Sequence, residues 1–137
     1  MKLLLISLIS FLSFVAIAGD NNVEIRTKGS SSLIHIDQIG TSNTAKVWCG
    51  LSEGTYPTHN CSNATIDIDQ EGTSNTAKAY SQVANHTGNE YKIDQDGNDN
   101  IGYIDADDDG NDMDVVQNGN NNDAEIYMQG DNNVYSI

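Results

Sequence analysis

Aliphatic residues recur in this chain as pairs two positions apart, and the pairs return every eleven residues. In the last third of the chain the second member of each pair is Ile93, Ile104, Val115, Ile126 or Ile137. A polar residue separates the two members, as Lys92 does between Tyr91 and Ile93. The period of two is typical of a strand with one buried face, and the fixed longer period is typical of stacked repeats.

The same frame covers the earlier part of the chain if two insertions are allowed. Ten residues are inserted between Cys49 and Cys61, and three more between Ser81 and Asn89. The pattern then predicts ten short strands, separated by turns rich in Gly, Asn, Asp and Ser, which tolerate positive φ. The aliphatic ladder of these strands consists of Ile25, Ile36, Val47, Ile68, Ile93, Ile104, Val115, Ile126 and Ile137.

Glutamine follows the aliphatic pair only in every second strand, at Gln38, Gln70, Gln95 and Gln117. One coil therefore contains two strands and about 22 residues. The sequence predicts an all-β fold: a β-solenoid of about five stacked strand-turn-strand coils, of the cross-β kind that forms fibres. Stacking places the four glutamines in one inward column, where each side-chain amide can bond to its neighbours above and below.

The first eighteen residues have the pattern of a signal peptide. Lys2 supplies a positive start, a long apolar run follows, and a small-residue cleavage site ends at Ala18. The apolar run is short for a bilayer-spanning helix, so we expect cleavage and no transmembrane segment in the mature chain. We expect residues 1–18 to lie outside the fold, and residues 19–137 to form one repeat domain with an insertion loop at residues 50–60.

Acidic residues strongly outnumber basic ones. Twenty Asp and Glu stand against six Lys and Arg, which gives a formal net charge of −14. This charge argues against nucleic acid as a partner, because the phosphate backbone would be repelled. The sequence has no recognisable Ser/His/Asp grouping or phosphate-binding loop, and a thin coil leaves little volume for a pocket, so we expect no enzyme activity.

Four runs of eight residues share the pattern Gln-x-Gly-x-x-Asn-x-Ala, with Gly in place of Ala in one of them. The pattern resembles the repeat of curlin, the subunit of bacterial curli fibres, and the resemblance spans nearly all of residues 19–137. The residues that match the family's core and turn residues are Gln38, Gly40, Asn43, Ala45, Gln70, Gly72, Asn75, Ala77, Gln95, Gly97, Asn100, Gln117, Gly119, Asn122 and Ala124. The family's second glutamine is replaced here by Cys49, Ser81, Ala106 and Met128.

The resemblance to curlin implies a structural function. Curlin subunits are secreted through an outer-membrane export pore and form extracellular cross-β fibres on the cell surface, which serve adhesion, aggregation and the biofilm matrix. The resemblance also implies other copies of this chain and a second curlin-like subunit as partners. The alternative function is that of a monomeric, secreted, calcium-stabilised β-solenoid that acts as a binding or adhesion module.

The ends of the predicted solenoid favour self-assembly. Each end exposes the edge of a strand, and the residues near both ends show no polar or helical cap. Head-to-tail stacking would continue the alternation of strand types from one copy to the next. Such a contact does not close on itself, so it generates a fibre.

Cysteine and aspartate residues supply the remaining candidate chemistry. Cys49 and Cys61 flank the insertion, and in a secreted chain with two cysteines we expect a disulfide across its base. Asp105, Asp107 and Asp109 match the opening of a calcium loop, but its twelfth position is Val116 rather than Glu. The three aspartates are a candidate for weak calcium binding only, and we expect no other cofactor.

Outward-facing residues also fall into columns. Asp67, Lys92 and Asp114 share one column in which the charges alternate, and this favours the proposed register. Trp48 and Tyr80 share an aromatic column on the other strands. Packing on the fibre surface is the favoured interpretation of these aromatic residues, and a carbohydrate-binding ridge is the alternative.

Overall fold

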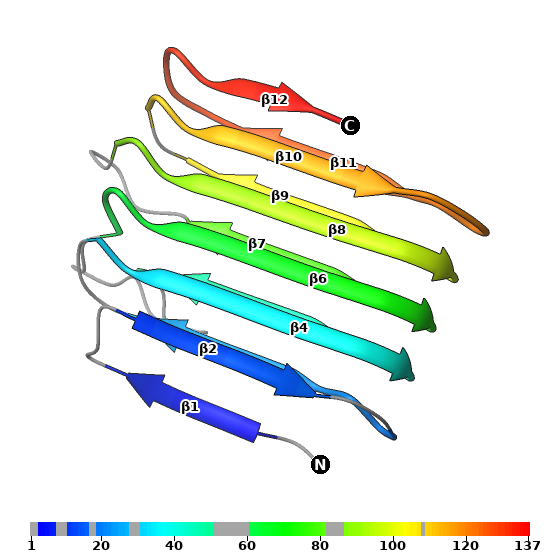
Figure 1. The fold of residues 1–137 in the computed structure, drawn as a ribbon. Helices are drawn as coiled ribbons and strands as arrows, with labels where there is room; N and C mark the ends of the chain where they lie inside the picture. Colours follow the sequence, from blue (N-terminus) through cyan, green and yellow to red (C-terminus); the bar gives the residue numbers. More distant parts are fainter. Residues whose placement is uncertain are drawn as a thin grey trace.

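The computed structural model describes residues 3–7, 11–16, 19–27, 31–50, 61–81, 87–107 and 109–137, and only the backbone in the first two ranges. Every regular element in these ranges is a β-strand, and the strands form two parallel six-stranded sheets (Figure 1). Sheet A holds β1 (Leu3–Ser7), β3 (Val23–Thr27), β5 (Ala45–Cys49), β7 (Ala77–Ser81), β9 (Gly102–Ala106) and β11 (Ala124–Met128). Sheet B holds β2 (Phe11–Ala16), β4 (Leu33–Thr41), β6 (Thr65–Thr73), β8 (Glu90–Asn98), β10 (Asp112–Gln117) and β12 (Val134–Ser136).

The chain alternates between the two sheets, and each strand pairs with the strand two places later in the sequence. Equivalent residues of successive repeats therefore lie directly above one another, as Ile36, Ile68 and Ile93 do in sheet B. The ten strands predicted from the repeat correspond to β3 through β12. The predicted β-solenoid is confirmed.

The core is a thin layer between the two sheets. Burial alternates along the strands, so that Ala45, Val47 and Cys49 of β5 are buried while Lys46 and Trp48 face outward. Most of the predicted aliphatic ladder is buried in this way: Ile25, Ile36, Val47, Ile68, Ile93, Ile104 and Val115. Only the last two members of the ladder are not fully buried, because no further strand in the described ranges pairs with the outer side of β11 or β12. Ile126 is partly buried and Ile137 is 70% exposed.

The Ala position of the repeat is a column of small residues in sheet A that comprises Ala45, Ala77, Gly102 and Ala124. A Cβ atom added to Gly102 would lie 2.7 Å from Cγ1 of Val115 in the opposite sheet. It would also lie 3.6 Å from the amide nitrogen of Gln95. The small column therefore leaves the space that the aliphatic and glutamine side chains of sheet B fill.

The structure adds two strands in the segment that we expected to lie outside the fold. Strand β1 pairs with β3 and places Leu5 beside Ile25, and β2 pairs with β4 and places Phe14 beside Ile36. The leader places apolar residue types at the register positions of the inward columns of both sheets, so the uncleaved chain continues the solenoid by one coil. Cleavage after Ala18 stays a prediction.

The turn after each glutamine strand has one recurring backbone conformation. We expected the Gly, Asn, Asp and Ser clusters of these turns to supply residues that tolerate positive φ. Positive φ occurs within the clusters, but the Gly of the Gln-x-Gly pattern does not carry it. It falls on the following residue, with φ of 96° at Thr41, 100° at Thr73, 94° at Asn98 and 85° at Asn120. Asn tolerates this region of φ far better than a β-branched residue, so the two threonine turns are strained.

Candidate functional site: amide ladders and sheet faces

Four glutamines form a hydrogen-bonded ladder through the interior of sheet B. The Nε2 of Gln38 donates to Oε1 of Gln70 at 2.7 Å, Gln70 donates to Gln95 at 2.7 Å, and Gln95 donates to Gln117 at 2.8 Å. The first three side chains are buried. Every rung thus links to the next through a buried amide, which satisfies polar groups that a thin core would otherwise leave unpaired.

The Gln ladder has a direction. Every Nε2 donates towards the C-terminal rung, so Oε1 of Gln38 is left without a hydrogen-bond donor among the described residues. Gln38 is nevertheless fully buried. Ala16 of β2 occupies the neighbouring register position, and alanine has no side-chain amide to donate. An unpaired acceptor therefore marks the N-terminal end of the ladder.

A second ladder runs along the turn that leads from sheet B to sheet A. Asn43, Asn75, Asn100 and Asn122 hydrogen-bond through their side-chain amides at 3.1, 2.7 and 2.6 Å in succession. The first three side chains are buried. The Gln and Asn of the repeat therefore act as two parallel columns of amides that run from rung to rung.

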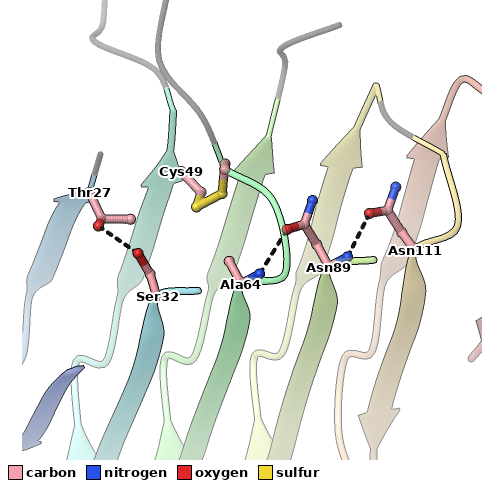
Figure 2. Close-up of a disulfide and its surroundings, with 7 residues drawn as sticks. Thr27, Ser32, Cys49, Ala64, Asn89 and Asn111 are labelled. Atoms are coloured by element: carbon pink, nitrogen blue, oxygen red, sulfur yellow. Dashed lines mark hydrogen bonds between the residues drawn. A yellow bond between two sulfur atoms is a disulfide. The ribbon is translucent and has the colours of Figure 1, made fainter. Parts of the chain in front are cut away.

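The opposite turn contains a third column, in which the side chains bond to the backbone of the preceding rung. Oδ1 of Asn89 accepts from the backbone N–H of Ala64 at 3.0 Å, and Oδ1 of Asn111 accepts from that of Asn89 at 3.3 Å (Figure 2). Asn133 accepts from the N–H of Asn111 at 2.9 Å. We did not assign Asn89 a role from the sequence, although it occupies the same place in the frame as Asn111 and Asn133.

The last residues of the sheet A strands β3 to β11 form the closing column of this sheet: Thr27, Cys49, Ser81, Ala106 and Met128. This column lacks a glutamine ladder and contains a covalent link instead. Cys49, the last residue of β5, forms a disulfide with Cys61, with the two Cα atoms 5.6 Å apart (Figure 2). Both cysteines are fully buried. The bond joins the two ends of the insertion at residues 50–60, of which 51–60 lie outside the described residues.

The outward face of sheet B is strongly acidic. One column contains His35, Asp67, Lys92 and Asp114 on successive rungs. The ammonium of Lys92 lies 3.8 Å from a carboxylate oxygen of each of three residues, Asp67, Asp69 and Asp94. Burial, followed by the charge of Asp67, raises the pKa of Asp69, and Lys92 offsets part of this rise. Lysine 92 is therefore the internal counter-ion of this face.

Metal-ligating side chains converge at one place in the described ranges. His35, Asp67 and Asp69 offer ligand atoms within 4.8 Å of one another. Nδ1 of His35 is already 3.2 Å from Asp67, and Lys92 offsets part of the charge of the two carboxylates. The predicted calcium candidates do not form such a group: Asp105 accepts a hydrogen bond from the hydroxyl of Tyr103, and Asp109 accepts one from the backbone of Asp131.

The outward face of sheet A is aromatic. The rings of Trp48 and Tyr80 stack with their centroids 4.1 Å apart and their planes 9° from parallel, and Tyr103 lies against Tyr80 at 5.5 Å. The ammonium of Lys78 lies 5.4 Å from the centre of the Tyr103 ring. Because Trp48 and Tyr80 stack on each other, a sugar ring could not insert between their facing surfaces. This geometry favours packing along the solenoid over a carbohydrate-binding ridge.

Two tyrosines on this face have perturbed acidity. Burial, the nearby Asp105 and Glu125, and a hydrogen bond to Asp105 together raise the pKa of Tyr103 to about 12. Burial and Asp105 also raise the pKa of Tyr80. Both hydroxyls therefore stay protonated well into the alkaline range.

Comparisons with protein-family models, with curated proteins and with solved structures gave no match to this chain. Within the described residues, no helix has the length and apolar character that a membrane span requires. The fold itself defines the class of protein, a parallel two-sheet β-solenoid with inward amide ladders.

Proposed function

We propose that this protein is a structural subunit of extracellular fibres of the curlin type, and that its copies stack head to tail. The observation that carries the proposal is the Gln ladder. Each rung repeats the same inward amide at hydrogen-bonding distance from the next, from Gln38 to Gln117. In-register stacks of this kind form the core of cross-β fibres. At a head-to-tail junction the last rung is β12, which pairs with β10 only from Val134 to Ser136, so the junction extends the backbone pairing and the aliphatic columns and not the Gln ladder itself.

The C-terminal end of the stack supports the same proposal. Strands β11 and β12 are the outermost strands of the two sheets at this end (Figure 1). Val134, Tyr135 and Ile137 are 63%, 58% and 70% exposed, although Tyr135 and Ile137 continue columns that are buried in the earlier rungs. An edge with free backbone groups and exposed apolar residues favours pairing with another strand.

The charge distribution fits a fibre that must stay soluble before assembly. The acidic face of sheet B repels its counterpart on another copy, so side-by-side aggregation is disfavoured, while the sheet edges remain available for end-to-end contact. We propose secretion after removal of residues 1–18, a cell-surface location, and the partners that the resemblance to curlin implies, namely an export pore and a second curlin-like subunit. We propose no catalytic function.

The test is assembly of the purified mature chain, residues 19–137, followed by electron microscopy and fibre diffraction in buffer with and without a chelator. We expect fibres with a meridional spacing of about 4.8 Å in both buffers. A compact monomer that unfolds when calcium is chelated would overturn the proposal and support a calcium-stabilised binding module instead.

Two single substitutions on β11 test whether this strand forms the proposed head-to-tail contact between copies. Ile126 faces the core column at the open edge, and Tyr127 on the same strand faces outward and is 50% exposed. We expect Ile126→Lys to slow fibre growth by about tenfold or more, because the buried charge would be unpaired in the junction. Tyr127→Lys adds the same charge to the outward face, and we expect little change in growth.

A further inference from the structure

The leader segment occupies one of the two sheet edges that the proposed fibre needs. Strand β1 is the outermost strand of sheet A next to β3, and β2 is the outermost strand of sheet B next to β4 (Figure 1). Without them, the backbone groups along the outer sides of β3 and β4 would have no strand to pair with. The core residues Val23, Ile25, Ile34 and Ile36 are at most 5% exposed with the leader in place.

The leader and the C-terminal edge present the same kind of residue to these columns. Beside β4, the leader places Leu12 and Phe14 in the columns of Ile34 and Ile36. At the far end of the stack, Tyr135 continues the first of these columns beside Met113. In sheet A the leader places Leu3 and Leu5 beside β3, and β11 places Ala124 and Ile126 in the equivalent columns. Either segment therefore places apolar residue types at the register positions of the N-terminal coil.

The leader is nonetheless an incomplete substitute for a repeat coil. Ala16 lies beside Gln38 in the register, and Oε1 of the buried Gln38 has no donor there. A buried carbonyl oxygen without a donor costs about 1–3 kcal/mol in this coil. The C-terminal edge of a second copy presents β12, whose register with β10 runs only from Val134 to Ser136, so it brings no glutamine to Gln38 either. The leader therefore has no advantage over that edge at this position once cleavage has removed its covalent link.

We propose that β1 and β2 form a temporary end coil on β3 and β4, and that removal of residues 1–18 opens this edge to the C-terminal edge of a second copy. The inference rests on the proposed function. While the leader is attached, its local concentration at β3 and β4 is in the millimolar range or above, far higher than that of any second copy. Cleavage removes this advantage, so growth at this end of the fibre starts only after processing.

The geometry predicts that an uncleaved chain terminates growth at one end only. Its β11 and β12 are open, so it can add to the exposed β3 and β4 of a mature fibre. Once added, it presents its own leader instead of an open edge. It cannot add to the other end of the fibre, because that addition would require its own β3 and β4.

The experiment uses seeds of the mature chain that grow in mature monomer, with a small fraction of purified uncleaved chain added, and follows each fibre end by time-resolved atomic force microscopy. We expect one end to stop and the other to continue, so that the overall growth rate falls by about half. The control is the uncleaved chain with Leu5→Pro and Phe14→Pro, which keeps the length and apolar character of the leader but prevents strand pairing. We expect this control to terminate neither end.

Each outcome separates the two proposals. If the mature chain forms no fibres, the proposed function fails. If fibres form and the uncleaved chain leaves both ends growing, stops both ends, or acts no differently from the proline control, the leader inference is overturned while the fibre proposal stands. Hydrogen exchange gives an independent reading: we expect the backbone amides of β3 and β4 to exchange at least tenfold faster in the proline control than in the uncleaved chain.

Discussion

The two sheets face the same core but are held together differently. Sheet B has strands of up to nine residues, an inward ladder of Gln and an acidic outer face. Sheet A has strands of no more than five residues in β3 to β11, an inward column of Ala and Gly, and an aromatic outer face. Its closing column holds Thr27, Cys49, Ser81, Ala106 and Met128 instead of an amide ladder.

The difference shows how a thin solenoid divides its interior. The small side chains of sheet A leave the room that the long glutamine side chains of sheet B need, as the close approach of Val115 and Gln95 to Gly102 indicates. Sheet B thus links successive rungs by hydrogen bonds, and sheet A supplies the complementary surface. We expect substitutions in the two sheets to differ in cost accordingly.

The largest expected effect is that of Gln70→Leu in sheet B. The substitution removes a rung from the middle of the ladder. It leaves the Nε2 of Gln38 without a partner and the Oε1 of Gln95 with only the backbone N–H of Thr76, at 3.3 Å. We expect a loss of about 4 kcal/mol in the free energy of unfolding, measured by urea denaturation of the dilute monomer. The matched change in sheet A, Ser81→Ala, should cost about 1 kcal/mol. Equal costs for the two variants would contradict the distinction between the sheets.

The disulfide at the end of β5 is the strongest link in the closing column of sheet A. Replacement of both Cys49 and Cys61 by serine should lower the free energy of unfolding by about 3 kcal/mol, because the unfolded chain regains the freedom of the loop between them. Chemical reduction of the unmodified protein should reproduce this loss. A reduced protein as stable as the oxidised one would show that the bond does not constrain the solenoid.

The fit between the sheets is tested at Gly102. We expect Gly102→Ala to lower the free energy of unfolding by about 2 kcal/mol, because the added methyl group would overlap Cγ1 of Val115. The companion variant carries Val115→Ala as well. A double-mutant cycle should show that the two substitutions cost less together than the sum of their separate effects. Additive costs would mean that the two residues do not limit each other.

The strained turns after the strands of sheet B offer a stabilising change. Thr73 has a φ of 100°, and the equivalent residue one rung later is Asn98 with a φ of 94°. We expect Thr73→Asn to raise the free energy of unfolding by about 1 kcal/mol, because asparagine adopts positive φ at lower cost. The reverse change, Asn98→Thr, should lower it by at least as much. A rise in both variants would be inconsistent with strain at this position.

The smallest expected effects are those of pH on the two outer faces. The raised pKa of Asp69 means that the folded state binds a proton more tightly than the unfolded state, so this group adds stability as the pH falls towards its ordinary value of 3.8. The raised pKa of Tyr103, about 12, means that its contribution to stability is lost as the pH rises from about 10 to about 12. Asp69→Asn should weaken the dependence of the free energy of unfolding on pH in the acid range. Tyr103→Phe should weaken the same dependence in the alkaline range. Unfolding midpoints across pH measure both, and a variant profile parallel to that of the unmodified protein would refute the assignment.

The repeat frame was enough to predict the ten strands from β3 to β12, because a one-residue slip would have turned buried residues such as Ile68 to the solvent. It also brought the four glutamines into one column. The pairing of β1 and β2 was not predicted, because the leader lacks the turn residues of the repeat and its charge and length match a signal peptide. The sequence predicted positive φ in these turns but assigned it to no single residue, because glycine, the residue that adopts it most easily, lies next to the residue that does so.

The direction of the glutamine ladder has an electrical consequence. Because every amide in the column from Gln38 to Gln117 donates the same way, the small dipoles of the side chains add instead of cancelling. The asparagine column from Asn43 to Asn122 donates the opposite way, towards the N-terminal rung, so its dipoles oppose those of the glutamines. The two columns of amides would therefore largely cancel in a filament, and its two tips would differ in which strands are open far more than in partial charge.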